Sequence, residues 1–242
     1  MTEPPTIVHL DRLVQSGVHL DDAQLRQFDR YSSLLRERNE VVNLTAIVDP
    51  AEIATKHFLD SLTLLLVRTP APAARLIDVG TGAGFPGVPL AIARGDVRVT
   101  LVESVGKKVR FLEELIVALE LANVTIIQAR AEDLARDPAH RERHDVAVVR
   151  ALPVLATNLE LLLPLCRVGG DAVAYKGRVE AELGAAARAA RALGGEITRV
   201  VTTAELSLGD ALPGRCLVIA SKRRPTPARY PRTASELKRQ VW

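Results

Sequence analysis

Four closely spaced glycines, Gly80, Gly82, Gly84 and Gly87, follow Asp78 directly after a short apolar run. Glycine lets the backbone turn sharply and leaves no Cβ between the backbone and a ligand. If a helix begins here, its free N-terminal amides face the same ligand. The spacing therefore predicts a strand–loop–helix unit that binds a nucleotide-like molecule, with Asp78 and the glycines in the binding loop.

A carboxylate stands at the end of the next apolar run, roughly 25 residues past Asp78. In a doubly wound sheet, a carboxylate placed as Glu103 is binds the hydroxyls of a ribose. Residues 82–87 also satisfy the GxGxxG pattern of dinucleotide binding. The glycine spacing alone therefore leaves a nicotinamide or flavin cofactor open.

Two further groups of side chains invite a chemical interpretation that their context disfavours. His57, Asp60 and Ser61 are neighbours on one helix rather than a nucleophile relay, and no GxSxG elbow occurs in the sequence. A structural or RNA-facing polar patch is therefore favoured over a hydrolase. His140 and His144 have helical ligand spacing but lie in a charged run that predicts surface, so no metal site is expected.

The composition excludes several classes of protein. Of the 242 residues, 48% are hydrophobic and 25% charged, as in a soluble globular protein. Cys166 and Cys216 are too few and too far apart for a disulfide framework and are expected to be buried thiols. No apolar run approaches the roughly 18 residues needed to span a bilayer, and the first residues lack a signal peptide. A cytoplasmic protein without a membrane partner is expected, and its net charge of +3 permits a polyanionic partner.

The elements that must position these residues fall into three regions. Residues 1–70 carry apolar residues at helical spacing and predict an N-terminal helical region, which ends at successive prolines. Residues 71–222 alternate β-branched runs with helical segments and predict a doubly wound α/β sheet covered on both faces. The expected strands are 76–79, 97–102, 124–127, 146–149, 172–175, 197–203 and 216–221, and the expected helices include 107–121, 155–165 and 179–193.

The last two expected strands break the alternation. No helix lies between them, and their connecting loop contains Gly209, Pro213 and Gly214. Two strands so close in sequence pair antiparallel, so the seven-stranded sheet is expected to end in an antiparallel hairpin. Residues 223–242 form a basic stretch punctuated by prolines and are expected to be a solvated tail.

Several separated motifs resemble one known family. The loop at 78–87, followed by a strand that ends in an acid, is similar to the S-adenosylmethionine (SAM) site of class I methyltransferases. Together with residues 42–45, 57–62, 104–112, 149–151 and 175–177, it resembles the GidB/RsmG family over most of the chain. The resemblance implies a Rossmann-like methyltransferase fold. It also implies an enzyme that transfers methyl from SAM to N7 of a guanosine in 16S ribosomal RNA.

The resemblance also implies roles for individual residues. Arg150, at the end of the fourth strand, would lie beside the transferred methyl group. It is therefore expected both to take part in catalysis and to bind the cofactor. The residues implied at the cofactor are Gly80 and Phe85 in the loop, Glu103 and Ser104 at the ribose and methionyl part, and Ala131 and Glu132 at the adenine.

Basic residues are expected at the carboxyl edge of the sheet, where they suit contacts to RNA phosphates. They are Lys107, Lys108, Arg110, Lys176 and Arg178, to which the family-like ending adds Arg232. The implied partner is 16S ribosomal RNA or the 30S particle, acted on by a monomer. Asn39, Asn43 and Thr45 are expected either to order the passage from helix to loop or to contact substrate.

The implied nucleophile predicts a mechanism without a general base. Guanine N7 presents a lone pair and carries no proton, so no catalytic His, Asp or Glu is expected. Arg150 is expected to orient the flipped base or its phosphate. It should either lie clear of the positive charge that develops on the ring or be offset by a carboxylate such as Asp145. A small NAD(P)-dependent oxidoreductase and a nonenzymatic ribosome-assembly factor remain the alternatives. Binding of SAM rather than NADH would distinguish the methyltransferase from the oxidoreductase. Catalytic turnover on ribosomal RNA would distinguish it from the assembly factor.

Overall fold

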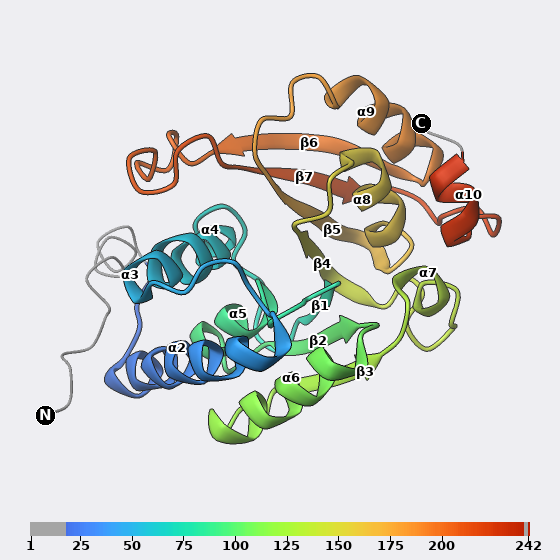
Figure 1. The fold of residues 1–242 in the computed structure, drawn as a ribbon. Helices are drawn as coiled ribbons and strands as arrows, with labels where there is room; N and C mark the ends of the chain where they lie inside the picture. Colours follow the sequence, from blue (N-terminus) through green and yellow to red (C-terminus); the bar gives the residue numbers. More distant parts are fainter. Residues whose placement is uncertain (1–17, 240–241) are drawn as a thin grey trace, which may run out of the picture.

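Seven strands form one mixed sheet in the computed structural model, which describes residues 18–239 and 242 (Figure 1). Their order across the sheet is β3-β2-β1-β4-β5-β7-β6. The first five strands are parallel, and β7 runs antiparallel to both β5 and β6. The strands are β1 (Arg75–Val79), β2 (Arg98–Glu103), β3 (Val124–Gln128), β4 (His144–Arg150), β5 (Cys166–Lys176), β6 (Gly195–Thr202) and β7 (Cys216–Lys222). The predicted doubly wound sheet with an antiparallel hairpin is confirmed.

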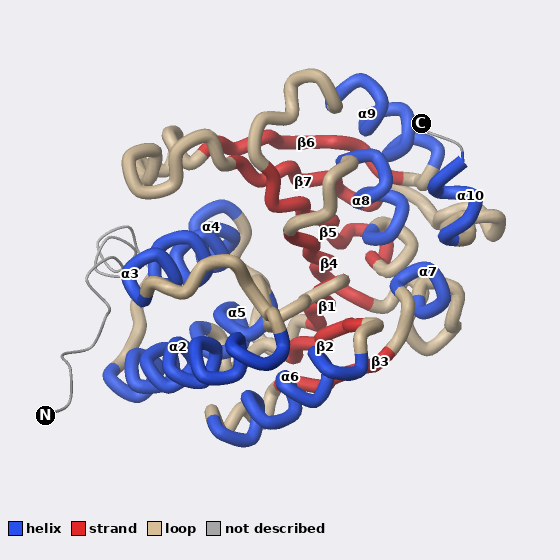
Figure 2. The backbone as a smooth tube through the Cα atoms, viewed as in Figure 1, coloured by secondary structure: helices blue, strands red, loops and turns tan. Residues whose placement is uncertain are grey.

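Helices cover both faces of the sheet because side chains along each strand alternate between two apolar clusters. Leu76 and Val99 belong to the cluster beneath one set of helices, whereas Ile77 and Val79 belong to the cluster on the opposite face. Figure 2 shows the strands between these two groups of helices. The first group is α2 (Asp22–Val42), α4 (Asp60–Val67), α5 (Gly87–Ala93) and α6 (Gly106–Ala118), and the second is α7 (Ala131–Leu134), α8 (Leu155–Leu162) and α9 (Leu183–Ala192).

The described N-terminal segment is helical, as predicted, whereas residues 1–17 lie outside the described part. Asp21 begins α2 with a capping box: its carboxylate accepts from the Gln24 backbone amide, and the Gln24 side-chain oxygen accepts from the Asp21 backbone amide, each at 2.8 Å. Further along the chain, α3 (Pro50–Ile53), a six-residue π-helix η1 (Ala54–Leu59) and α4 follow one another without a break. This continuous segment carries His57 and Asp60 toward the carboxyl end of β4.

The basic C-terminal stretch is not the solvated tail that its charge predicts. Arg136 Nη2 donates to the Pro231 carbonyl at 2.6 Å, and Arg141 Nη1 donates to the Tyr230 carbonyl at 2.9 Å. The indole nitrogen of Trp242 donates to Glu160 at 2.6 Å. These bonds hold the stretch against the body of the protein, where it adds α10 (Ala234–Arg239) beside α7 and α8 (Figure 1).

Three further predictions from the sequence concern the cysteines, membrane-spanning helices and His144. Both cysteines are free and buried, as predicted. Among the residues that the structure describes, no helix is long and apolar enough to cross a membrane. The surface position expected of His144 is wrong, because the side chain is fully buried at the start of β4 and stacks with His140 at 5.8 Å between ring centroids. Burial lowers the pKa of His144 to about 3.

Candidate functional site

A cavity of about 540 Å³ opens at the carboxyl ends of the central parallel strands. The strand order reverses at β1, and doubly wound sheets bind their ligands at such a switch point. The wall of the cavity comes from the loop after β1, the end of β2, the start of α7 and the end of β4. Of the residues predicted at the cofactor, it brings together Gly80, Gly82, Phe85, Glu103, Ser104, Ala131, Glu132 and Arg150.

The glycine loop presents bare backbone to this cavity. Gly80 and Gly82 have φ angles of 65° and 63°, a left-handed conformation that favours glycine. A Cβ added at Gly80 would meet no heavy atom within 4 Å, and one at Gly82 would meet only the Gly80 carbonyl at 4.0 Å. Such side chains would project into open space, so the loop fits a ligand that lies directly on its backbone.

Asp78 and Gly84, also predicted at the cofactor, stand behind the loop and do not line the cavity. Asp78 Oδ2 accepts from the Thr81 hydroxyl at 2.6 Å and the Gly87 amide at 2.8 Å, which fixes the loop. Its Oδ1 has no hydrogen-bond partner among the described residues, and burial raises the pKa of Asp78 to about 6. A Cβ at Gly84 would approach Tyr31 Oη to 2.7 Å, so this glycine permits close packing against α2.

The Glu103 carboxylate is held rigidly where β2 ends. Its Oε2 accepts from the Gly82 amide at 3.0 Å, and its Oε1 accepts from the Ser104 and Val105 amides at 2.8 and 2.9 Å. An ionised carboxylate offers about four acceptor positions, so capacity remains for a hydroxyl donor in the cavity. This position fits the predicted contact with a ribose.

Arg150 is fixed by acceptors from the N-terminal helices. Its Nη1 donates to Asp60 Oδ2 and to the Lys56 carbonyl, both at 3.1 Å, and its Nη2 donates to His57 Nδ1 at 3.1 Å. The guanidinium carbon lies 4.8 Å from the centroid of the Phe85 ring. Arg150 is therefore a positioned side chain at the cavity wall rather than a mobile surface cation.

The carboxylate that offsets Arg150 is Asp60, and the expectation of Asp145 is wrong. Asp145 lies near the amino end of β4, the opposite edge of the sheet, where it pairs with Arg167 at 2.7 Å. Asp60 is 3% exposed and also accepts from Arg215 Nε at 3.2 Å and Nη2 at 2.7 Å. One buried carboxylate thus holds two guanidinium groups.

His57 is a neutral member of this cluster. Burial, followed by the nearby charge of Arg150, lowers the pKa of His57 to about 3. Its ring stacks on Phe85 with centroids 4.4 Å apart, and its Nε2 lies 2.8 Å from the Thr45 hydroxyl. The buried Ser61 hydroxyl donates to the His57 carbonyl rather than to the ring, so the helix spacing does not form a nucleophile relay.

A second cavity, of about 390 Å³, adjoins the first. His57, Arg150 and Ala151 border both cavities, which places this cluster at their junction. The second cavity is otherwise lined by Ile47, Lys56, Asp60, Ala211, Leu212, Pro213 and Arg215. Arg215 and Lys56 were absent from the sequence-based site, since no motif singles out an arginine before β7 or a lysine within a helix.

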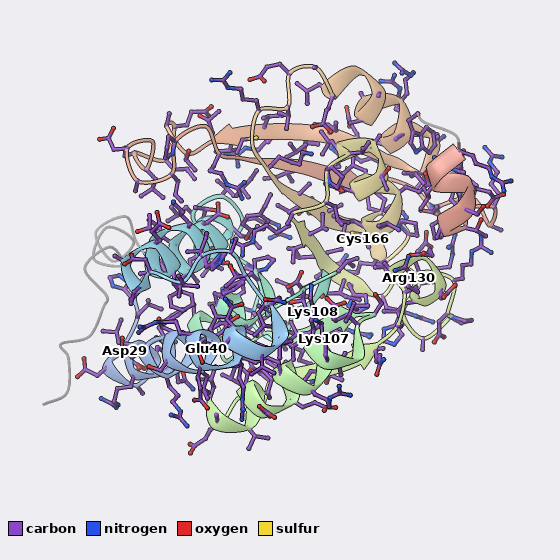
Figure 3. The ribbon with its side chains drawn as sticks, in the orientation of Figure 1. Asp29, Glu40, Lys107, Lys108, Arg130 and Cys166 are labelled. Carbon is purple, nitrogen blue, oxygen red and sulfur yellow. The ribbon has the colours of Figure 1, made fainter. Side chains whose placement is uncertain are left out.

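Four of the six cations predicted to contact RNA are exposed or line the first cavity. Lys107, Arg110 and Arg178 are exposed, and Lys108 lines the first cavity. Figure 3 shows Lys107 and Lys108 at the start of α6.

The structure corrects the assignment of the other two cations, Lys176 and Arg232. Lys176 is 8% exposed, and its ammonium group donates to the Pro153 carbonyl at 2.5 Å and pairs with Glu182 at 3.0 Å. Arg232 pairs with the fully buried Glu160 at 2.7 Å. Both positive charges are therefore paired with carboxylates of the protein itself.

Asn39 has the ordering role that was one of its two predicted interpretations. Its Oδ1 accepts from the Leu44 and Thr45 amides at 2.7 and 2.8 Å, and its Nδ2 donates to the Thr45 carbonyl at 2.9 Å. Asn43 ends α2 in a left-handed conformation, with φ of 54°. The loop that carries Thr45 is therefore fixed at the cavity edge.

Residues 18–239 and 242 contain no cluster with the geometry of a metal site. No group of three or more His, Cys, Asp or Glu side chains converges in that part of the chain.

The sequence matches one family over most of its length. The profile of GidB, described as rRNA small subunit methyltransferase G, matches residues 24–207. A protein named "Ribosomal RNA small subunit methyltransferase G" from Roseiflexus castenholzii is 49% identical over 220 residues, which cover 89% of this chain and 91% of that protein. A protein of the same name from Dehalococcoides mccartyi is 42% identical over 219 residues, covering 90% and 92% of the two chains.

Solved structures resemble the fold at low sequence identity. An antibiotic-resistance methyltransferase, Kmr, superposes with a TM-score of 0.51 at 22% identity, covering 64% of this chain and 89% of that chain. A SAM-dependent methyltransferase from Aquifex aeolicus gives 0.51 at 18% identity, covering 71% and 93%. These similarities concern the arrangement of the sheet and its helices.

Proposed function

This chain belongs to the GidB family, rRNA small subunit methyltransferase G, and from that premise we propose how its site works. The enzyme transfers the methyl group of SAM to N7 of a guanosine in 16S ribosomal RNA, acting as a monomer in the cytoplasm. The proposal rests on the junction of the two cavities at Arg150 and His57. The glycine loop lines the first cavity, and Lys56, Arg150 and Arg215 line the second.

The first cavity suits SAM in size and in the groups on its wall. Its volume of about 540 Å³ lies within the range of small-molecule sites. The bare backbone at Gly80 and Gly82 leaves room for the ligand, Glu103 would accept from the ribose, and residues 131–132 would border the adenine end. When bound there, SAM supplies an electrophilic methyl group on a sulfonium.

The protein's contribution to the reaction is orientation. Guanine N7 needs no proton removed, so no side chain has to act as a base. Arg150 is held by Asp60, His57 and the Lys56 carbonyl and cannot swing freely. It lies at the junction, where it orients the incoming nucleotide toward the first cavity. Alignment of reacting atoms can supply several kcal/mol of barrier reduction without proton transfer.

The single-turnover rate at saturating RNA and SAM is expected to vary less than about twofold from pH 7 to pH 9. His57 has its pKa lowered to about 3, so it stays neutral throughout this window. Asp78 has its pKa raised to about 6 and is mostly ionised above pH 7. Rapid-quench measurements with radiolabelled SAM test the profile. A tenfold rise per pH unit that disappears on mutating one ionisable residue would show that a base is required.

RNA binding is expected to weaken steeply with salt, because each neutralised phosphate releases counterions. Lys107 and Arg110 are exposed on the first turns of α6, beside the first cavity. Lys107→Ala and Arg110→Ala should each reduce the slope of log affinity against log salt by roughly 0.7 to 0.9. Filter binding of 16S ribosomal RNA between about 50 and 200 mM salt measures this slope.

Arg143 provides the matched control for these two variants. It is also exposed, but it precedes β4 and therefore lies at the amino edge of the sheet, away from both cavities. Arg143→Ala should leave the salt slope unchanged, and all three variants should retain SAM affinity. If all three variants reduced the salt slope equally, RNA would be attracted by the overall positive charge of the protein. The proposed contact surface on α6 would then be wrong.

The function itself is tested by methylation of 16S ribosomal RNA from cells that lack this gene. Purified enzyme and SAM should produce 7-methylguanosine at one position, detected by nuclease digestion and mass spectrometry. Calorimetry should show binding of SAM and not of NADH. Methylation of another base atom, or binding of NADH instead, would refute the proposal.

A further inference from the structure

Thr45 lies where the N-terminal helices meet the two cavities. It borders the first cavity together with Phe85 and Arg150. Its hydroxyl oxygen is 2.8 Å from the Nε2 of His57, a residue that borders both cavities. The three bonds from Asn39 hold the backbone around Thr45. The hydroxyl is therefore held beside the point at which a nucleotide in one cavity meets a cofactor in the other.

The direction of each hydrogen bond in this cluster is determined by chemistry. An arginine has no acceptor atom, so the Nη2 of Arg150 must donate to the Nδ1 of His57 at 3.1 Å. A neutral imidazole has one donor and one acceptor nitrogen, so Nε2 carries the ring proton. Nε2 then donates to the hydroxyl oxygen of Thr45. The lowered pKa of His57, about 3, keeps the ring neutral and this polarity fixed near neutral pH.

A second donor uses the remaining lone pair of the Thr45 hydroxyl oxygen. The Ile47 amide donates to the same hydroxyl oxygen at 3.0 Å. A hydroxyl has two lone pairs and one hydrogen, so both lone pairs are used from within the protein. In the described part of the chain, no acceptor receives that hydrogen. It remains available to an acceptor in the cavity that Thr45 borders.

We infer that the Thr45 hydroxyl donates a hydrogen bond to O6 of the guanine being methylated and so selects guanine over adenine. The inference rests on the proposed function. Guanine presents two acceptors, N7 and O6, side by side on one edge, whereas adenine presents N7 beside an amino donor. With N7 directed at the methyl group, O6 meets the fixed hydroxyl of Thr45. An adenine amino group would there face a donor and remain unpaired, which is unfavourable.

The discriminating experiment changes O6 while leaving N7 in place. 16S ribosomal RNA is assembled by ligation with guanine, hypoxanthine or 2-aminopurine at the position that mass spectrometry identifies as methylated. Hypoxanthine retains O6 and lacks the 2-amino group, whereas 2-aminopurine lacks O6. The wild-type single-turnover rate should be similar for guanine and hypoxanthine and about tenfold lower for 2-aminopurine, the effect of one hydrogen bond. Equal rates on guanine and 2-aminopurine would overturn the inference and leave the proposed function intact.

Variants at Thr45 assign the discrimination to its hydroxyl. Thr45→Val should methylate guanine and 2-aminopurine at equal rates, and Thr45→Ser should retain the wild-type preference. Thr55→Val is the matched control, because it removes an exposed hydroxyl that donates to the Ala51 carbonyl on the neighbouring helix. SAM affinity should be the same in all four proteins. Loss of SAM affinity in Thr45→Val would instead assign the hydroxyl to the cofactor and refute the inference. Absence of any guanine methylation by the wild type would refute the proposed function as well.

Discussion

Gly82→Val is expected to weaken SAM binding about 100-fold, equivalent to nearly 3 kcal/mol. Gly82 has φ of 63°, a conformation that costs a β-branched residue roughly 1–3 kcal/mol. Its Cβ would extend into the first cavity, where the methyl groups would occupy the ligand's volume. The Gly82 amide also donates to Glu103, so a shift of this backbone would move the carboxylate proposed to accept from the ribose.

Isothermal titration calorimetry of the folded variant measures this loss of SAM affinity. Gly169→Val is the control for the effect of backbone strain alone. Gly169 has φ of 83° but lies on the exposed part of β5, far along the strand from the site. The control should lose stability and keep SAM affinity. Unchanged affinity in Gly82→Val would remove the glycine loop from the cofactor site.

Asp60→Asn is expected to destabilise the protein by about 3 kcal/mol and to slow methyl transfer about 100-fold. The substitution leaves two guanidinium groups, Arg150 and Arg215, facing each other without a compensating charge. The stability loss falls at the lower end of the range for buried ion pairs because the Arg215 side chain is 32% exposed. Arg150 would lose its fixed orientation at the junction, and displacements of about 1 Å can lower a rate 100-fold.

Thermal unfolding and single-turnover kinetics measure the two effects. The melting temperature should fall by roughly 6–12 °C in a chain of this size. SAM affinity should hardly change, because Asp60 does not line the first cavity. Asp145→Asn is the matched control: its partner Arg167 is 51% exposed, and such pairs contribute only about 0–1 kcal/mol. Equal effects of the two substitutions would contradict the role assigned to Asp60.

The sequence predicted the sheet well because its signals are local. Each expected strand is a short β-branched run, and the glycines after Asp78 mark a turn that leaves backbone open to a ligand. Glu103 was found for the same reason, because it ends an apolar run and the ends of parallel strands share one edge of the sheet, whereas the role of Arg150 came from the family resemblance. The glycine loop and Glu103 could therefore be predicted from the residues alone, and the family resemblance supplied the other predicted cofactor residues.

The second cavity depends on contacts that no local pattern carries. Asp60 and Arg215 are 155 positions apart in the sequence, and nothing near either residue indicates the other. Charge alone also failed to separate exposed cations from buried ones. Lys107 and Lys176 both follow strands predicted from the sequence, but a carbonyl and Glu182 enclose the ammonium group of Lys176. Partners of this kind are determined by how α8, α9 and the hairpin pack, which the sequence pattern does not specify.

The Asp60 cluster has a consequence for the order in which the enzyme is made. It joins η1 and α4 at the beginning of the chain, β4 in the middle and Arg215 at the start of the last strand. During synthesis, a nascent chain that ends before Arg215 holds Asp60 and Arg150 but lacks the second guanidinium group and one wall of the second cavity. Since domains form from the N-terminus as they emerge, the second cavity gains the wall that carries Arg215 only after η1, α4 and β4 have been made.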